Sequence, residues 1–166
     1  NHEVFFHVPV LLSLIQSFML LTKSYDYIFT GAGCAGMSIL MRLISSGLIS
    51  GKRVLLTDRD EKTRNDRTWC FWEKGEGFFE PVVYRNWKSI GFFSSDYNAQ
   101  MEIAPYCYKM IRGADFYQYC FNEFKKHPNI EFITGEVNFI NSGNSFQLYL
   151  DNSIINTSGS IVFNSI

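Results

Sequence analysis

The chain has 166 residues, of which 46% are hydrophobic and 19% charged, and its formal net charge is −1. This composition is typical of a globular protein with a sizeable core and excludes a disordered chain. Basic residues form no stripe or run, so no nucleic-acid partner is expected. The four cysteines, Cys34, Cys70, Cys107 and Cys120, form no C-x-x-C pair and have no neighbouring histidine. We therefore predict reduced thiols and no metal site.

Residues 1–24 form an apolar N-terminal extension that need not be native. The run from residue 4 to residue 21 is mostly apolar, but polar residues and Pro9 interrupt it, and it has no basic n-region or cleavage site. It is either an upstream artefact or unstructured extension, a membrane-associating segment, or a core element. Met19 would be a reasonable true start, because nucleotide-binding strands usually begin close to the N-terminus.

The stretch from Tyr25 to Asp58 has the order of a dinucleotide-binding βαβ unit. An apolar run leads into Gly31-Ala32-Gly33-Cys34-Ala35-Gly36, and a helical pattern follows, with Ile39, Leu40, Leu43 and Ile44 on one face. A second apolar run, Val54-Leu55-Leu56, ends in Asp58. Strand, glycine turn, helix, strand and acid therefore follow in the order that this motif requires.

Each glycine of the turn has a physical reason to be there. Gly31 allows a sharp turn off the strand, Gly33 leaves room for the backbone to approach a pyrophosphate, and Gly36 lets the helix pack close to the sheet. The helix N-terminus offers unpaired N–H groups to the phosphates. Asp58 lies 22 residues after Gly36, where a carboxylate accepts the ribose hydroxyls. An acid at this place favours FAD or NAD over NADP, and the motif does not separate the first two.

A charged loop, residues 59–67, follows Asp58 and gives way abruptly to Thr68-Trp69-Cys70-Phe71-Trp72. The loop is either a solvated surface loop or faces a ligand. The aromatic side chains either pack as a lid over the core or line a cavity for a flat, apolar molecule. The pattern does not distinguish these two alternatives.

The rest of the chain predicts short strands and one more helix. Strands are expected at Trp87–Phe93 and Gln100–Ile103, a helix at Ala114–Lys126, a strand at Ile130–Thr134, a hairpin at Glu136–Ile140 and Ser145–Leu150, and a last strand at Ile161–Phe163. The three histidines are scattered, and no Ser/His/Asp set or paired carboxylates stand out. The residue pattern alone nominates no catalytic group.

The glycine motif together with Asn65-Asp66-Arg67-Thr68-Trp69-Cys70-Phe71-Trp72 resembles the N-terminal part of the bacterial lycopene β-cyclase family. The Trp-rich string is the specific part, whereas the glycine motif is shared by the whole FAD-monooxygenase-like class. Tyr108–Phe116 and Val162–Ser165 are also similar, so the resemblance covers roughly residues 25–166. It implies a truncated α/β fold: a Rossmann-like FAD-binding βαβ domain over residues 25–166, with inserted antiparallel strands.

The resemblance implies FAD bound through the turn residues and Asp58, with NAD(P)H as reductant and lycopene as substrate. An acid protonates the terminal double bond, the next double bond attacks the cation, and loss of a proton leaves a β-ring without net redox change. Trp69, Phe71 and Trp72 are substrate-pocket candidates, and Arg67 either contacts the flavin phosphates or forms a salt bridge within its loop. The family's catalytic acid is expected beyond Ile166, so this chain alone should be an inactive fragment.

Two other functions remain open. One is a FAD-dependent oxidoreductase, such as a monooxygenase or polyprenyl reductase, and the other is a nucleotide-binding module without catalysis. Because carotenoids reside in membranes, the cyclase interpretation predicts a cytoplasmic protein held peripherally on the cytoplasmic membrane. The choice of one or two cyclised ends, the choice of NADH or NADPH, and the oligomeric state are not set by the sequence.

Overall fold

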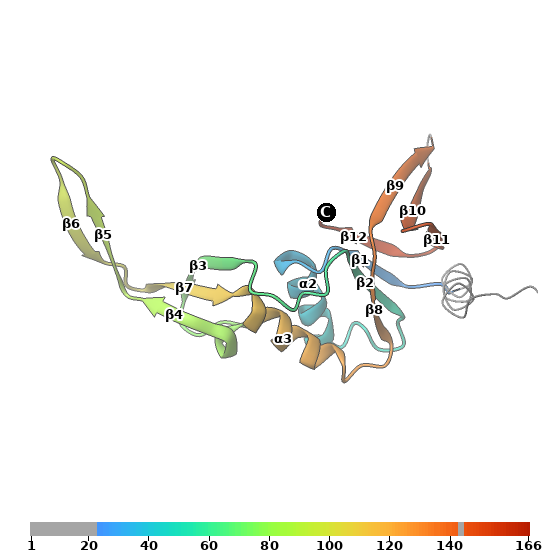
Figure 1. Ribbon diagram of the computed structural model, residues 1–166. Helices are drawn as coiled ribbons and strands as arrows, with labels where there is room; N and C mark the ends of the chain where they lie inside the picture. The colour runs from blue at the N-terminus through green and yellow to red at the C-terminus, as the bar shows by residue number, and fades with distance from the viewer. Residues whose placement is uncertain (1–22, 143–144) are drawn as a thin grey trace, which may run out of the picture. The chain divides into compact units, whose positions relative to one another are not determined.

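The computed structural model describes residues 23–142 and 145–166 (Figure 1). Most of the predicted apolar extension, residues 1–22, lies outside the described residues. The chain divides into two compact units. Unit 1 comprises the residues up to Glu61 and those from Phe124 onward, and unit 2 comprises Lys62–Glu123.

Unit 1 is built on a parallel sheet of four strands in the order β12-β1-β2-β8. The strands are β1 (Tyr27–Thr30), β2 (Val54–Asp58), β8 (Ile130–Thr134) and β12 (Ile161–Asn164). Helix α2 (Cys34–Ser45) connects β1 to β2. Every residue of β2 is buried, as expected for a central parallel strand with both faces covered. The predicted α/β fold with a βαβ unit is therefore confirmed.

The two faces of this sheet are covered differently (Figure 1). Ile28 and Leu55 pack on one face against Leu148 and Leu150 of a three-stranded antiparallel sheet. That sheet has the order β11-β10-β9 and comprises β9 (Val137–Ser142), β10 (Ser145–Leu150) and β11 (Ser153–Ile155). Side chains alternate along a strand, so the next residues face the other side, where α2 lies. Unit 1 thus has three layers: helix, parallel sheet, antiparallel sheet.

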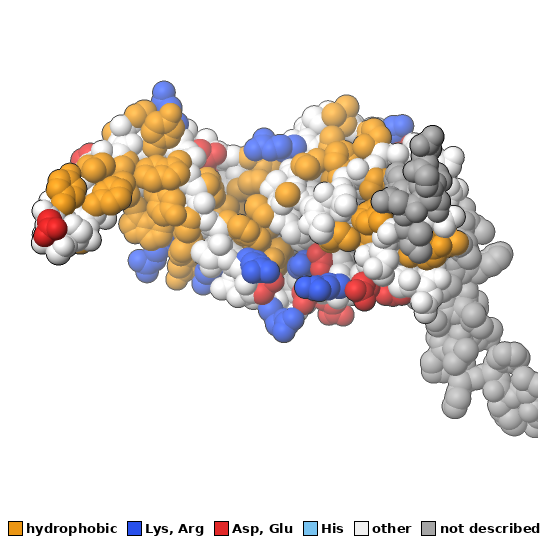
Figure 2. Space-filling model, turned by 90° about the horizontal axis from the view of Figure 1, so that it is seen from above, with side chains coloured by type: hydrophobic (Ala, Val, Ile, Leu, Met, Phe, Trp, Pro, Cys, Tyr) orange, Lys and Arg blue, Asp and Glu red, His pale blue; other side chains and the backbone are white. Residues whose placement is uncertain are grey.

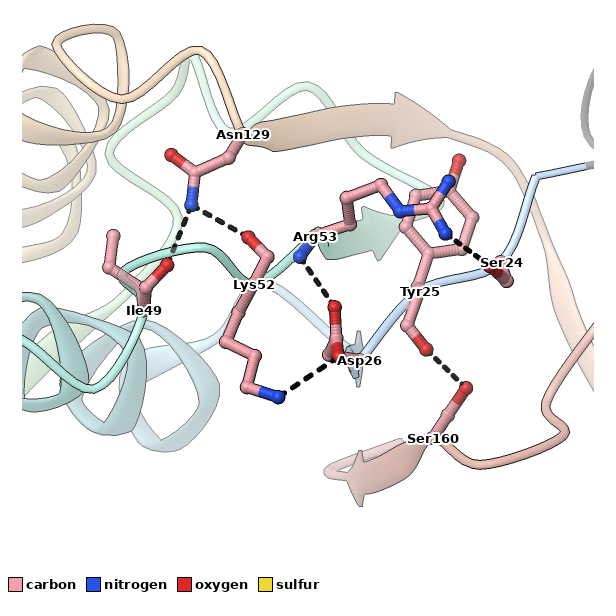
Figure 3. Close-up of polar contacts among 8 residues, drawn as sticks. All are labelled: Ser24, Tyr25, Asp26, Ile49, Lys52, Arg53, Asn129 and Ser160. Carbon is pink, nitrogen blue, oxygen red and sulfur yellow. Dashed lines mark hydrogen bonds and ion pairs between the residues drawn. The ribbon is translucent and has the colours of Figure 1, made fainter.

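A set of polar contacts holds the segments that enter the parallel strands (Figure 3). The Asp26 carboxylate accepts hydrogen bonds from the Arg53 main-chain N–H at 2.8 Å and from Lys52 Nζ at 3.2 Å. Both bonds lower the pKa of Asp26 below its ordinary value, and the bond from the Arg53 main chain has the larger effect. The Asn129 amide donates to the carbonyls of Ile49 and Lys52 at 3.0 and 2.7 Å. These contacts fix the N-terminal ends of β1, β2 and β8 relative to one another. They lie at the end of the sheet opposite to the carboxyl ends of the strands.

Unit 2 contains a three-stranded antiparallel sheet, a two-stranded hairpin and most of a second helix. The sheet has the order β3-β7-β4, and β5 pairs with β6. The elements are β3 (Thr68–Lys74), the short 3-10 helix η1 (Glu80–Val82), β4 (Val83–Trp87), β5 (Ser89–Phe93), β6 (Asn98–Glu102), β7 (Tyr106–Arg112) and α3 (Gly113–Phe124). The Trp-rich string predicted as a lid or lining is therefore a strand that pairs along its whole length with β7.

A buried lysine ties three parts of unit 2 together. The Lys109 side chain is 2% exposed, and its Nζ donates to Glu73 Oε2 at 3.0 Å, Glu80 Oε2 at 2.5 Å and the Gly75 carbonyl at 2.6 Å. Burial alone would lower the pKa of Lys109, but the bonds to both carboxylates raise it above its ordinary value. All three N–H donors of the ammonium are satisfied, as a buried charge requires.

Two predicted elements differ clearly from the observed ones, and one short observed strand was not predicted. The strand expected at Trp87–Phe93 is interrupted at Lys88, whose carbonyl accepts from the Ile103 N–H at 2.9 Å. The residues before Lys88 pair with β7 and those after it pair with β6. The helix expected at Ala114–Lys126 ends two residues earlier, at Phe124, and its end is closed by a turn in which the His127 N–H donates to the Phe124 carbonyl. Strand β11 was not expected, because a run of three residues has too short a pattern to be recognised.

Candidate dinucleotide-binding site

The order of the parallel strands defines one switch point in unit 1. From β1 the chain proceeds through α2 to β2 on one side, whereas β12 pairs with β1 on the other side. In open α/β sheets, ligands bind outside the carboxyl ends of the strands at such a point. The glycine turn, Gly31–Gly36, follows β1 there, and Asn164 and Ser165 lie at the end of β12.

The three glycines of the turn occupy three different environments. Gly31 has φ +104°, and a Cβ on it would lie 2.5 Å from Ser165 Oγ. A Cβ on Gly36 would lie 2.4 Å from the Gly31 carbonyl oxygen, so this glycine sets how closely α2 approaches the turn. A Cβ on Gly33 would meet nothing within 4 Å. This open space above Gly33 is where the motif holds a pyrophosphate.

The N-terminus of α2 faces this space without a competing anion. Gly33 is the N-cap residue, no side chain caps the helix, and its first turn carries no acidic residue. The first N–H groups of such a helix have no partner within the helix, and the helix dipole favours negative charge beside them. Cys34 opens the helix, and burial raises the pKa of its thiol, opposed by a contact with Ser38. The neutral thiol adds no negative charge where a phosphate would bind.

Asp58 lies against the glycine turn. Its Oδ2 accepts a hydrogen bond from the Ala32 N–H at 2.8 Å, and its Oδ1 accepts one from the Asp60 N–H at 2.9 Å. The side chain is 9% exposed at the end of β2, next to β1 in the sheet. The structure therefore brings the predicted acid and the predicted turn together, although 26 residues separate Asp58 from Ala32.

Ser165 and Asn164 complete the turn from the other end of the chain. Ser165 Oγ lies 3.1 Å from the Thr30 carbonyl and 3.2 Å from the Gly31 carbonyl, and donates toward both. Thr30 Oγ1 donates to Asn164 Oδ1 at 3.0 Å. The family resemblance includes Val162–Ser165 but implies no role for this string. Its spacing of more than 130 residues from Gly31 carries no local signal, and only the pairing of β12 with β1 reveals it.

The string before β3 holds the first turn of α3 in unit 2. Asn65 Oδ1 accepts from the Ala114 N–H at 3.3 Å, and Asp66 Oδ1 accepts from Tyr117 Oη at 3.1 Å. The Arg67 carbonyl accepts from the Gly113 N–H at 2.7 Å. The Arg67 side chain is exposed and makes no ion pair with any residue that the structure describes. Its observed bond is a main-chain one, and its contact with a flavin phosphate stays a prediction.

The three aromatic pocket candidates do not share one face of β3. Trp69 and Phe71 point to the inner face, where Trp69 packs edge-on against Phe116 at 5.3 Å and Tyr117 at 5.7 Å between ring centroids. Trp72 points to the other face and is 52% exposed. Trp69 therefore packs against α3, and the strand separates it from Trp72. Their contact with substrate stays a prediction.

Unit 2 also contains an open hollow of about 450 Å³ between η1, β4 and α3. Arg112 lies in its wall, with its guanidinium carbon 4.0 Å from the Tyr84 ring centroid and its Nε donating to Asp115 Oδ2 at 2.6 Å. The remaining lining residues are Pro81, Val82, Val83, Gln118, Tyr119 and Asn122. None of the predicted site residues lines it.

Two absences among the described residues bear on other kinds of site. No group of three or more His, Cys, Asp or Glu side chains within residues 23–142 and 145–166 is arranged to hold a metal ion. Over the same part of the chain, no helix combines the length and the hydrophobicity needed to cross a membrane.

Solved structures similar to this chain include flavin-dependent enzymes. The flavin-dependent brominase Bmp2 matches 85% of this chain and 37% of its own, with a TM-score of 0.55 and 14% identity. The halogenase PltM, in a complex with phloroglucinol and FAD, has a TM-score of 0.55 at 13% identity over 87% of this chain and 34% of its own. The probable FAD-dependent monooxygenase pqsL from Pseudomonas aeruginosa has a TM-score of 0.52 at 12% identity, over 84% of this chain and 40% of its own. The fold is thus that of the FAD-dependent halogenases and monooxygenases, and the chain spans about two fifths of their length or less.

The family of this chain is identified from its sequence similarity to a family model. No curated protein matches the chain. The family model "Lycopene cyclase protein" matches residues 26–163, which is most of the chain and includes the glycine turn, Asp58 and the Trp-rich string. The chain belongs to the lycopene cyclase family.

Proposed function

We propose that this chain supplies the FAD-binding part of a lycopene cyclase, an enzyme that closes β-rings at the ends of lycopene. The observation that carries this proposal is the fit of the switch point to a dinucleotide, in a chain of the lycopene cyclase family. Gly33 has open space where a Cβ would stand, and the α2 N-terminus beside it has neither a capping side chain nor an acid. The Asp58 carboxylate lies at the same turn.

The residues present have complementary tasks toward FAD. The N–H groups of Gly33, Cys34 and Ala35 would bind the pyrophosphate, and the Asp58 carboxylate would accept hydrogen bonds from the ribose hydroxyls. Ser165 holds Gly31 in its left-handed conformation, so the turn is formed before the ligand arrives. Arg67 is proposed as a further phosphate contact, because its guanidinium is exposed.

The proposed reaction is an isomerisation. A proton adds to the terminal double bond of lycopene, the next double bond attacks the resulting cation and closes a six-membered ring, and loss of a proton yields the β-ring. The number of electrons in the substrate does not change. When bound, reduced FAD would supply electron density near this cation, with NAD(P)H as the proposed reductant. Trp69 and Phe71, on the inner face of β3, are proposed to line a water-free path for the polyene, since aromatic faces favour cations and exclude water. Trp72 lies on the opposite face of the strand and is left out of this proposal.

The acid that protonates the double bond is not assigned to any residue of this chain. Following the family resemblance, we propose that it lies beyond Ile166 and that the 166-residue chain binds FAD without turnover. We further propose that the bacterial protein containing this chain is cytoplasmic and rests peripherally on the cytoplasmic membrane, where its substrate resides.

Two experiments test this proposal. Titration of the chain with FAD, followed by isothermal calorimetry, should show saturable binding that Asp58→Ala abolishes. The protein that contains this chain, expressed in a lycopene-accumulating bacterium, should convert red lycopene into β- or γ-carotene. Bound flavin with unconverted lycopene would instead favour a FAD-dependent oxidoreductase, the second candidate, which the fold of the brominase and monooxygenase neighbours also supports. Absence of flavin binding would contradict both.

A further inference from the structure

One face of the β3-β7-β4 sheet in unit 2 carries a row of aromatic rings. Trp72, Tyr108 and Trp87 are register partners across the three strands. The ring centroids of Trp72 and Tyr108 are 5.0 Å apart, and those of Tyr108 and Trp87 are 5.9 Å apart. Trp72 is 52% exposed, Trp87 38%, and Tyr106, two residues before Tyr108 on the same face, 50%. Large aromatic rings in this number rarely stay in water on a soluble surface.

The charged side chains on this face are basic. Alternation along β3 places Lys74 beside Trp72, and alternation along β4 places Arg85 beside Trp87. Arg112, at the end of β7, is paired with Asp115 of α3. Glu73, the acid of β3, points to the opposite face, where it binds the buried Lys109. The aromatic face is defined here as Trp72, Lys74, Arg85, Trp87, Tyr106 and Tyr108.

The neighbouring hairpin carries a second group of exposed hydrophobic side chains. The register pairs Ile90 with Met101 and Phe92 with Ala99, so these four apolar side chains share one side of the β5–β6 hairpin. Phe92 is 54% exposed and Met101 41%. Figure 2 shows hydrophobic side chains gathered over the part of unit 2 that holds β5 and β6. A two-stranded hairpin alone is marginally stable in water, so this surface gains stability when it is covered.

We propose that the aromatic face, together with the apolar side of the β5–β6 hairpin, binds the surface of an anionic lipid bilayer. Tryptophan and tyrosine concentrate at the level of lipid headgroups, because one part of the ring system is apolar and the other donates a hydrogen bond. Lys74 and Arg85 would lay their aliphatic stems along the rings and reach anionic headgroups with their charges. The proposal rests on the membrane association proposed above and names the surface responsible for it.

A second copy of the chain fits this face less well. In a two-fold symmetric dimer the same patch meets itself, so Lys74 and Arg85 of one copy would face the same cations of the other. Like charges across an interface oppose association. A bilayer that contains phosphatidylglycerol supplies both the apolar layer and the negative charges that the face requires.

The test uses the whole chain and vesicles of phosphatidylcholine with about one third phosphatidylglycerol. The Lys74→Gln/Arg85→Gln variant should lose about fivefold in partition coefficient for each cation removed, measured by co-sedimentation. The Trp72→Ser/Trp87→Ser variant should lose at least about tenfold. Matched controls are Lys125→Gln, an exposed cation outside this face, and Leu48→Ser, which is 57% exposed in unit 1. Both controls should bind as the unchanged chain does.

Tryptophan fluorescence gives an independent readout. The chain has three tryptophans, so Trp69→Phe leaves Trp72 and Trp87 as the only reporters. Their emission should shift to the blue on vesicle binding and be quenched by brominated lipids.

Three results would overturn the proposal. The first is vesicle binding that survives all face variants without quenching, which would assign binding to another segment. The second is equal binding to pure phosphatidylcholine, and the third is a dimer on gel filtration that the Trp72→Ser/Trp87→Ser variant dissociates. FAD titration of the same variants should be unchanged, so failure of the membrane surface is distinguishable from failure of the flavin site.

Discussion

The addition of one methyl group should weaken FAD binding at Gly33 but destabilise the fold at Gly36. This pair of substitutions is the sharpest test of the dinucleotide site. Gly33 has φ −85° and ψ −175°, which any residue adopts, and its Cβ would meet nothing within 4 Å. Replacement by alanine reduces the entropy of the unfolded chain, worth about 0.4–1 kcal/mol, and loses a comparable amount because alanine is a poor N-cap. The net change in the free energy of unfolding should therefore lie within about 0.5 kcal/mol of zero.

The Gly33→Ala methyl group would, however, occupy the space proposed for the pyrophosphate. We expect FAD affinity to fall by about 10–100-fold, equivalent to the roughly 1–3 kcal/mol that overpacking costs. Gly36→Ala has the other outcome, because its Cβ would lie 2.4 Å from a backbone oxygen that cannot move alone. This variant should lose about 1–3 kcal/mol of stability before any ligand is added.

The assay is thermal unfolding of the three proteins with and without FAD, together with calorimetric titration of FAD. Gly47→Ala is unsuitable as a control, because Gly47 has φ +73° and alanine would strain it. Ser158→Ala, an exposed change far along the chain, serves instead. If Gly33→Ala keeps full FAD affinity, the pyrophosphate does not lie over Gly33. If it unfolds like Gly36→Ala, the space above Gly33 is not open.

Other predictions concern Asp58 and the buried lysine. Asp58→Asn should abolish measurable FAD binding in a calorimetric titration, and binding at unchanged affinity would refute the ribose contact. Lys109→Met should destabilise unit 2 by about 2–3 kcal/mol in urea unfolding; this is below the usual cost of breaking a buried pair because Glu73 and Glu80 are about one third exposed. The bond from Lys109 lowers the pKa of Glu80 below its ordinary value of 4.5. Stability from this pair is therefore complete above that pH and is lost as the pH falls through the lower folded-state pKa, so Glu80→Gln should flatten the acid side of a stability-against-pH curve.

The βαβ unit was predictable because its signals are local. The apolar run of β1, the glycine turn and the helical pattern of α2 each lie within 12 neighbouring residues or fewer. Asp58 was singled out by its distance in sequence from the glycine turn. The helix and its connections have a typical length, and this length sets where the second strand ends. The structure agrees on the strands, the turn and the presence of the helix. The predicted apolar face of α2 is wrong in part, because Met37, Leu40 and Met41 are the buried side chains and Ile39 is 39% exposed.

Unit 2 was less predictable because its elements are joined by distant pairings. β3 pairs with β7, about 40 residues further along the chain. The pattern of apolar residues in a strand does not indicate which other strand pairs with it. The Trp-rich string reads as one aromatic block, whereas a strand turns successive side chains to opposite faces. Trp69 therefore packs on α3 and Trp72 faces outward, and no composition argument separates the two.

The glycine turn is held together by residues that lie far apart in the sequence. Gly31 takes a left-handed conformation in which its carbonyl oxygen and that of Thr30 accept hydrogen bonds from Ser165 Oγ. Ser165 reaches this place only when β12 pairs with β1, and the Ser165 N–H donation to the Thr30 carbonyl at 2.9 Å extends that pairing. A buried carbonyl that loses such a donor costs about 1–3 kcal/mol. The turn that we propose binds the nucleotide is thus stabilised by the last strand of the described chain, and FAD binding should require that this strand has paired.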